Sequence, residues 1–173
     1  MDRRVLAAAL AIGSAAACSP PARLALTDTR GAVSVVEHFL KADLNGPPDS
    51  AWALLRGCDV LPAADYFAPT LEARIIGAAT AHDTVRVAAR YVLLGKLISG
   101  SKGRVIWQFT PDVRADTVTF AVVPDSSGRL WIECGDYPPI HSDIARLSGN
   151  EGQMDASTRA AWTAALVAAR KLR

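Results

Sequence analysis

Four side chains in the middle of the chain are of the types that transfer protons. Asp65 and Tyr66 are adjacent, and His82 and Tyr91 follow further along the chain. Proton transfer beside a carbonyl group needs a carboxylate or an imidazole as base, and a phenol or a protonated acid to stabilise the developing oxyanion. These residues define one hypothesis, an acid–base site. The alternative is structural, with His82 in an exposed turn, Tyr91 in the core and Asp65 in a loop or helix cap.

Metal, phosphate and nucleic-acid chemistry are not indicated. The three histidines, His38, His82 and His141, are scattered, and no pair of Cys or His residues has the spacing of metal ligands. The glycines stand singly rather than in a phosphate-binding loop. The formal net charge is +2 and 50% of the residues are hydrophobic, as in a globular domain and unlike a nucleic-acid binder. We therefore expect no cofactor, no metal site and no nucleic-acid partner.

The first residues have the order of an export signal. Arg3 and Arg4 precede the apolar run Val5–Ile12, and small residues follow it. The run is far shorter than the roughly 20 residues that cross a bilayer as a helix. The sequence therefore predicts a signal peptide over residues 1–17.

Two kinds of processing would both leave Cys18 as the first residue. Ala15 and Ala17 form the A-x-A pair of an ordinary signal-peptidase site. The run from Ala15 to Cys18 also resembles a bacterial lipobox, with Ala15 in place of the usual Leu or Val. That resemblance implies lipidation of Cys18 and an acyl anchor. We expect an exported lipoprotein on the bacterial cell envelope, facing the periplasm, with residues 18–30 as a tether. A soluble periplasmic or secreted protein is the alternative.

The cysteine count agrees with this processing. An exported chain with three cysteines leaves one thiol over, and lipidation of Cys18 would account for it. Cys58 and Cys134 are then free to pair in an oxidising compartment, where a bridge closing such a loop stabilises a protein by roughly 4 kcal/mol. Two separate buried thiols are the alternative.

The elements that must position these residues change from helical to extended along the chain. Apolar residues at three- and four-residue spacing predict a helix over 32–44, and a short second helix carries Trp52 and ends at Gly57. Alternating patterns predict strands over 73–80, 84–97, 104–109, 116–123 and 129–134. The second strand becomes apolar on both sides at 92–94, so that end should be covered on both faces.

A last helix is predicted from Asp155 to the end of the chain. Its basic end complements the helix dipole, or alternatively contacts an anionic bilayer. Runs of helices and then a meander of strands predict an α+β fold, with one sheet and helices packed on a single face.

The stretches VVEHFLKADLNGPPDSAWALL (35–55) and DSSGRLWIECGDY (125–137) are similar to the nuclear-transport-factor-2-like superfamily in its bacterial form. In that superfamily an amphipathic helix leads to a short helix, and a curved antiparallel sheet wraps the helices into a cone. The resemblance implies this cone for residues 31–147, with 148–173 as an added helical extension.

The superfamily includes isomerases, dehydratases, polyketide cyclases and protein-binding modules, so the fold does not select an activity. No position here matches the catalytic aspartates of the isomerase and cyclase families. We therefore expect a noncatalytic envelope lipoprotein whose cone binds an apolar small molecule or an envelope protein. The alternative is a small-molecule enzyme of the ketosteroid isomerase or polyketide cyclase type, with an Asp/His and Tyr pocket.

Overall fold

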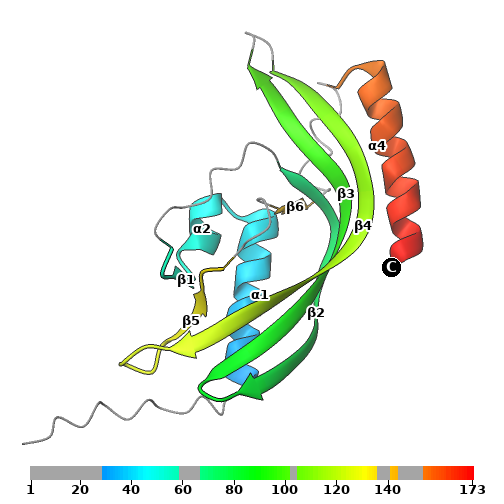
Figure 1. The fold of residues 1–173 in the computed structure, drawn as a ribbon. Coiled ribbons are helices and arrows are strands. Elements are labelled where there is room, and N and C mark those ends of the chain that lie inside the picture. Colours follow the sequence, from blue (N-terminus) through cyan, green and yellow to red (C-terminus); the bar gives the residue numbers. More distant parts are fainter. Residues whose placement is uncertain (1–28, 59–66, 102–104, 136–140, 144–153) are drawn as a thin grey trace, which may run out of the picture.

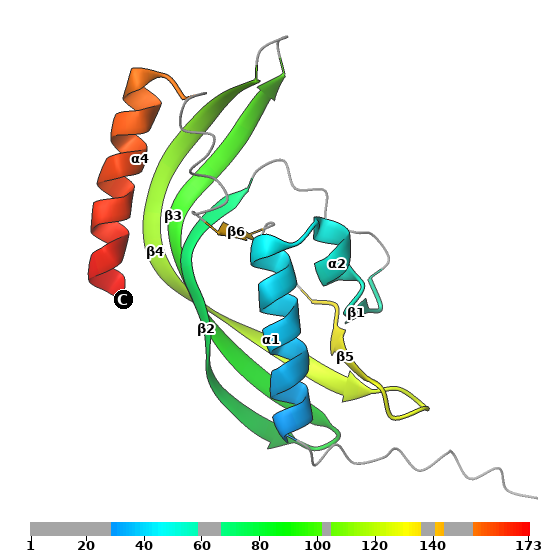
Figure 2. The ribbon, with the colours of Figure 1, turned by 180° about the vertical axis from the view of Figure 1, so that it is seen from behind.

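The computed structural model describes residues 29–58, 67–101, 105–135, 141–143 and 154–173. One six-stranded sheet, in the order β1-β5-β4-β3-β2-β6, carries helices on both faces (Figures 1 and 2). The α+β class is therefore confirmed. The long strands are antiparallel, whereas β1 beside β5 and β6 beside β2 are parallel, so the sheet is mixed.

The elements, in chain order, are α1 (Thr29–Asn45), α2 (Pro48–Trp52), β1 (Leu55–Arg56), β2 (Ala68–Ala81), β3 (Thr84–Ser101), β4 (Val105–Pro124), β5 (Leu130–Glu133), β6 (His141–Asp143), α4 (Ala156–Ala169) and the 3-10 turn η2 (Arg170–Leu172). None of the helices in the described part of the chain has both the length and the apolar character needed to span a membrane. The predicted leader, Cys18, Asp65 and Tyr66 lie outside the described residues.

Helix α1 lies in the hollow of the curved sheet, against the half that ends in the β2–β3 hairpin (Figure 1). The helix buries Val36, Phe39 and Leu40, whose spacing places them on one side, as the sequence predicted. The Phe39 ring lies 5.2 Å from the ring of Phe120 on β4. These residues share a core with Val87 of β3, so the concave face under α1 is filled by side chains.

Helix α4 packs on the opposite, convex face of the sheet, against the other half of β3 and β4 (Figure 2). Its buried Trp162 contacts Phe109 of β4 edge-on, with ring centroids 5.1 Å apart. Val92 and Leu94 of β3 belong to the same cluster. The expectation that the helices share one face is therefore wrong. Apolar residues on both sides of β3 at 92–94 gave this half of the sheet a second face to bury.

Both ends of α4 are fixed by polar contacts. Asp155 caps the first turn by accepting a hydrogen bond from the Thr158 amide at 2.7 Å. At the other end, Arg90 of β3 donates to the carbonyl oxygen of Leu172. Arg173 lies 3.3 Å from a carboxylate oxygen of Glu72 on β2. The helix is thus tied to both β2 and β3 where it leaves the sheet.

A single strand, β4, replaces the two strands predicted over 104–109 and 116–123. Pro111 lies between the two predicted strands, and proline cannot donate to a strand ladder. In the structure, Leu93 pairs with Arg114 and Gly95 with Pro111, so one extra residue of β4 forms a bulge there. Gly95 has a φ of +148°, and a Cβ at this position would lie 2.1 Å from the carbonyl oxygen of Thr110. Only glycine allows this approach of the two strands.

The second helix is also shorter than predicted, since α2 ends at Trp52. Leu55 instead begins β1 and pairs in parallel with Ile132 of β5. Next to this pair, Cys58 and Cys134 form a disulfide with their Cα atoms 5.2 Å apart. The predicted bridge is therefore confirmed. It ties the segment after β1 to the segment after β5.

The β4–β5 connection is organised by one carboxylate. Asp125 accepts hydrogen bonds from the Ser127 hydroxyl at 2.6 Å and from the Trp131 indole at 2.9 Å. It also accepts from the amides of Ser127 and Arg129. The hydrogen bonds from Ser127 and Trp131, which stabilise the ionised form, hold the pKa of Asp125 far below its usual value of 3.8.

We predict that Trp162→Ala lowers the free energy of unfolding by about 3 to 5 kcal/mol, because it leaves a cavity between α4 and the sheet. Val167→Ala on the exposed side of the same helix is the matched control and should change it by less than about 0.5 kcal/mol. Urea denaturation measures both values. Equal losses in the two variants would contradict the packing of α4 described here.

The contribution of Asp125 to stability should depend on pH. Because its pKa is lower in the folded chain than in the unfolded one, the contribution is complete above the usual pKa of 3.8 and is lost as the pH falls below it. The stability difference between the wild type and Asp125→Asn should therefore shrink between pH 7 and pH 3 in urea denaturation. The difference for Val167→Ala, which removes no titrating group, is the control and should stay constant. A difference for Asp125→Asn that is the same at both pH values would disprove this role.

Candidate functional site

The structure separates the residues that suggested an acid–base site. His82 is exposed in the β2–β3 turn with a φ of +56°, whereas Tyr91 is 1% exposed within β3. At roughly 3.3 Å per residue, the stretch of strand between them places their backbones more than about 20 Å apart. They therefore cannot act on one substrate atom. Asp65 and Tyr66, the other two candidates, lie outside the described residues.

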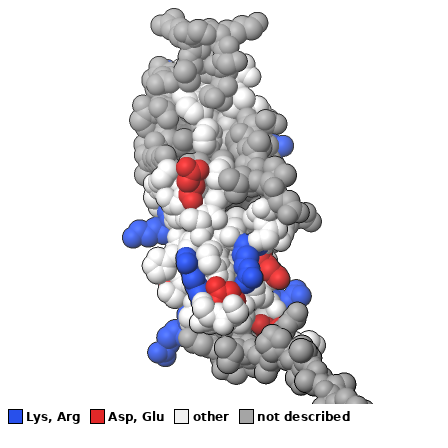
Figure 3. Space-filling view, turned by 90° about the vertical axis from the view of Figure 1, so that its left-hand side faces the viewer, with Lys and Arg blue, Asp and Glu red and all other residues white. Residues whose placement is uncertain are grey.

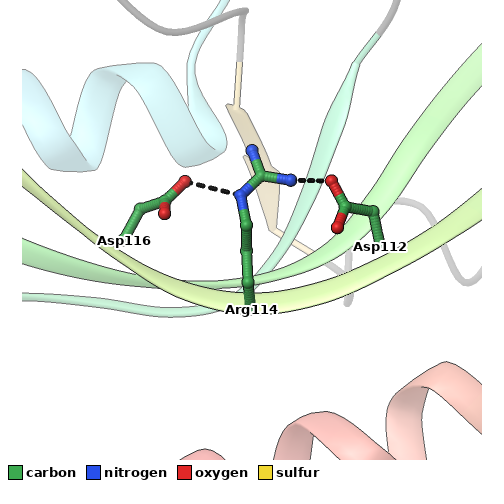
Figure 4. A network of polar contacts seen from close by, with 3 residues as sticks. All are labelled: Asp112, Arg114 and Asp116. Carbon is green, nitrogen blue, oxygen red and sulfur yellow. Dashed lines mark hydrogen bonds and ion pairs between the residues drawn. The ribbon is translucent and has the colours of Figure 1, made fainter.

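Tyr91 faces the concave side of the sheet, where β4 brings a polar cluster that the sequence analysis missed. The cluster consists of Asp112, Arg114 and Asp116, which rise from β4 on the side of α1 and away from α4 (Figure 4). The Nε atom of Arg114 donates to Asp116 at 2.8 Å, and its Nη1 atom donates to Asp112. We call these three residues the Arg114 cluster.

Cross-strand register sets the surroundings of the Arg114 cluster. Asp116 pairs with Tyr91, and Arg114 pairs with Leu93, both on β3. Leu93 in turn pairs with Thr70 of β2, whose buried hydroxyl donates to the carbonyl of Ala68 at 2.9 Å. The residues that neighbour the cluster on β3 and β2 are therefore buried, while its own charged side chains are 41 to 51% exposed.

The geometry of the Arg114 cluster suits the binding of a polar group better than proton transfer. Both carboxylates already accept hydrogen bonds from one guanidinium group, which leaves fewer acceptor positions for a proton from a substrate. Half-exposed ion pairs of this kind are also screened by water. The alternation D-x-R-x-D at 112–116 was the available sequence signal, because residues two apart on a strand share a face.

Two further hollows lie among the described residues, and neither is lined by a paired acid and phenol. One follows the outer side of α4, next to Arg159, Val167 and Lys171. Another lies between α1 and β2, next to Lys41 and Ile75. No group of three or more His, Cys, Asp or Glu side chains within the described ranges is arranged to hold a metal ion.

Charges on the open, concave side of the molecule are of both signs. The view onto the side opposite α4 shows acidic and basic side chains close to one another between large uncharged areas (Figure 3). His38, on the exposed side of α1, is hydrogen-bonded through Nδ1 to the carbonyl of Ser34 at 2.8 Å. The open side therefore offers no single strong field to a charged ligand.

Comparisons of the chain with protein-family models, with curated proteins and with solved structures find no match. The functional argument therefore depends on the residues and the geometry described above.

We predict that the Arg114 cluster contributes little to folding. Replacing Arg114 by Gln should lower the free energy of unfolding by no more than about 1 kcal/mol, since its ion pairs are half exposed. Leu93→Ala, directly across the sheet, removes buried apolar volume and should cost about 2 to 5 kcal/mol. Urea denaturation compares the two variants. An effect of Arg114→Gln as large as that of Leu93→Ala would make the cluster a structural element.

Proposed function

We propose that this protein is a noncatalytic, exported lipoprotein of the bacterial cell envelope, with a cone-shaped domain of the nuclear-transport-factor-2-like type that binds a partner or an apolar ligand. The observation that carries the proposal is the disulfide between Cys58 and Cys134. Disulfides form and persist in oxidising compartments and are rare in the cytosol. Pairing of these two cysteines leaves Cys18 over, at the position where the lipobox resemblance predicts an acyl anchor.

The arrangement of α1 on the sheet supports the cone. A helix lying in the hollow of a strongly curved sheet, followed by a short second helix, is the order that the resemblance implies (Figure 1). Helix α4 packs outside the hollow, on the convex face, as expected for an extension added to such a domain. The bacterial form of the superfamily is thus the fold assignment that we favour.

A binding role is favoured over catalysis by the contents of the hollow. Val36, Phe39 and Leu40 of α1 fill its lower part, and the charged groups beyond them are engaged with one another. A small-molecule enzyme of the ketosteroid isomerase or polyketide cyclase type is the second candidate. The observation in its favour is the cross-strand pair of Asp116 and Tyr91, a carboxylate and a phenol on one face.

The anchor is tested by Cys18→Ser in a bacterial host. The variant should lose its acyl chains and move from the membrane fraction to the soluble periplasmic fraction, because a lipid chain is what holds the mature protein. Ser19→Ala, which leaves the cysteine in place, is the matched control and should stay with the membrane. Globomycin, which blocks lipoprotein signal peptidase, should cause the precursor of the wild type to accumulate.

Two results would refute the anchor. One is a Cys18→Ser protein that remains with the membranes as the wild type does. The other is a precursor that is processed normally in the presence of globomycin.

A further inference from the structure

Half of the convex face of the sheet is left uncovered, and it carries more basic than acidic side chains. Helix α4 covers this face only as far as Arg90, which donates to the carbonyl of Leu172. From there to the β2–β3 turn, cross-strand register places three arginine side chains on the outer side of the sheet. These are Arg74 on β2 and Arg86 and Arg90 on β3, each paired with a position that faces away from α1.

Two further arginines border this area. Arg173, at the end of α4, reaches Glu72 on β2. Arg129 stacks on the ring of Trp131, at 4.0 Å from its centroid, and Trp131 pairs with Val123 on the outer side of β4. We call Arg74, Arg86, Arg90, Arg129 and Arg173 together the cationic half-face.

Arginines outnumber acidic side chains on the cationic half-face. Strands β2, β3 and β4 carry three acids, all within the described residues. Asp112 and Asp116 lie with Arg114 on the concave side. Of the three acids, Glu72 is on the convex side, where Arg74 and Arg173 share it at 3.3 Å each. At the border of the half-face, Asp125 accepts a hydrogen bond from the Trp131 indole on which Arg129 stacks, and Glu133 lies on the same side of β5 as Trp131. Among the described residues Arg86 has no ion-pair partner.

The half-face keeps like charges together at a cost to folding. Arg74 and Arg90 are directly opposed on adjacent strands. Like charges at opposed positions destabilise a sheet. Such an arrangement is useful where a negatively charged surface will neutralise it.

We propose that the cationic half-face lies against an anionic lipid bilayer. Small and hydroxyl side chains separate the arginines: Gly77 and Ala79 on β2 and Thr117 and Thr119 on β4 are exposed, so a flat surface can approach closely. Ile76, in the bulge of β2 beside this area, is 50% exposed and can enter the interfacial layer. Clustered arginines attract anionic headgroups over about a Debye length.

A bilayer fits the half-face better than a nucleic acid does. Single strands bind through aromatic side chains on which bases stack, and Arg129 already stacks on the one aromatic ring at this border. The start of α1, to which the tether is joined, lies at the end of the sheet that holds the β2–β3 turn (Figures 1 and 2). An anchor attached there would bring this end of the sheet to the membrane. The choice of a bilayer thus rests on the proposed function.

The experiment uses the full chain carrying Cys18→Ser, so that no acyl chain contributes, and vesicles of equal parts phosphatidylglycerol and phosphatidylcholine. Arg86→Gln together with Arg129→Gln removes two charges without breaking a described ion pair. We expect the partition coefficient, measured by vesicle sedimentation at low salt, to fall about 30-fold. Lys41→Gln with Lys96→Gln removes the same charge from α1 and from the concave side of β3, and is the matched control, which should bind as the parent chain does. Circular dichroism verifies that both variants are folded.

Three outcomes would overturn the proposal. They are equal binding of the two double variants, equal binding of the parent chain to pure phosphatidylcholine vesicles, and tighter binding of the parent chain to single-stranded DNA than to the anionic vesicles. Because the assayed chain is unlipidated, its failure to bind leaves the Cys18 anchor unaffected. Failure of the anchor likewise leaves the vesicle result valid.

Discussion

The close contact between Gly95 and β4 determines the shape of this molecule. A Cβ at Gly95 would collide with the Thr110 carbonyl, and the φ of +148° is one that other residues rarely adopt. Opposite it, the bulge at Pro111 adds a residue to β4. Bulges bend a strand and increase its twist, so β3 and β4 curve together along their length. The sheet becomes concave toward α1 and convex toward α4 (Figure 1).

This curvature divides the burial of apolar surface between two faces. Below the bend, Val87 and Phe120 are covered by α1, and the outer face remains open. Above it, Leu94 and Phe109 are covered by α4 on the outer face. Charged side chains on the uncovered outer half remain in contact with solvent, because no described helix packs against it. A hollow that is filled from within and an outer half-face rich in arginine together favour surface binding over chemistry inside a cavity.

The periodicity of apolar residues predicted those helices and strands that bury only one of their sides. Helix α1, the β2–β3 hairpin and α4 follow from the spacing of their apolar residues. Features that depend on pairing with a distant strand could not be predicted from the sequence. Leu55 continued a helical pattern locally, and only its pairing with Ile132 makes it a strand residue. Residues 110–115 were left between two predicted strands because the pairing of Pro111 with Gly95 could not be recognised from the sequence.

Prediction of the candidate site failed for the same reason, since it depends on how the strands extend and pair. His82 and Tyr91 are close in sequence, but an extended strand keeps them far apart. Asp112 and Arg114 fell between two predicted strands and Asp116 was the first residue of the second, so the face that the three share in β4 was overlooked. Their common face exists only because β4 continues through the bulge. The disulfide was foreseen from the cysteine count, and the proximity of Cys58 and Cys134 required the parallel pairing of β1 with β5.

The central claim is that the domain works outside the cytosol. Peptide mass mapping tests it most directly, on protein purified from its own host without reduction. The account predicts a mature chain that begins at an acylated Cys18 and contains a peptide pair joined through Cys58 and Cys134. A chain that retains Met1, carries free thiols at both positions and is recovered from the cytosol would contradict it.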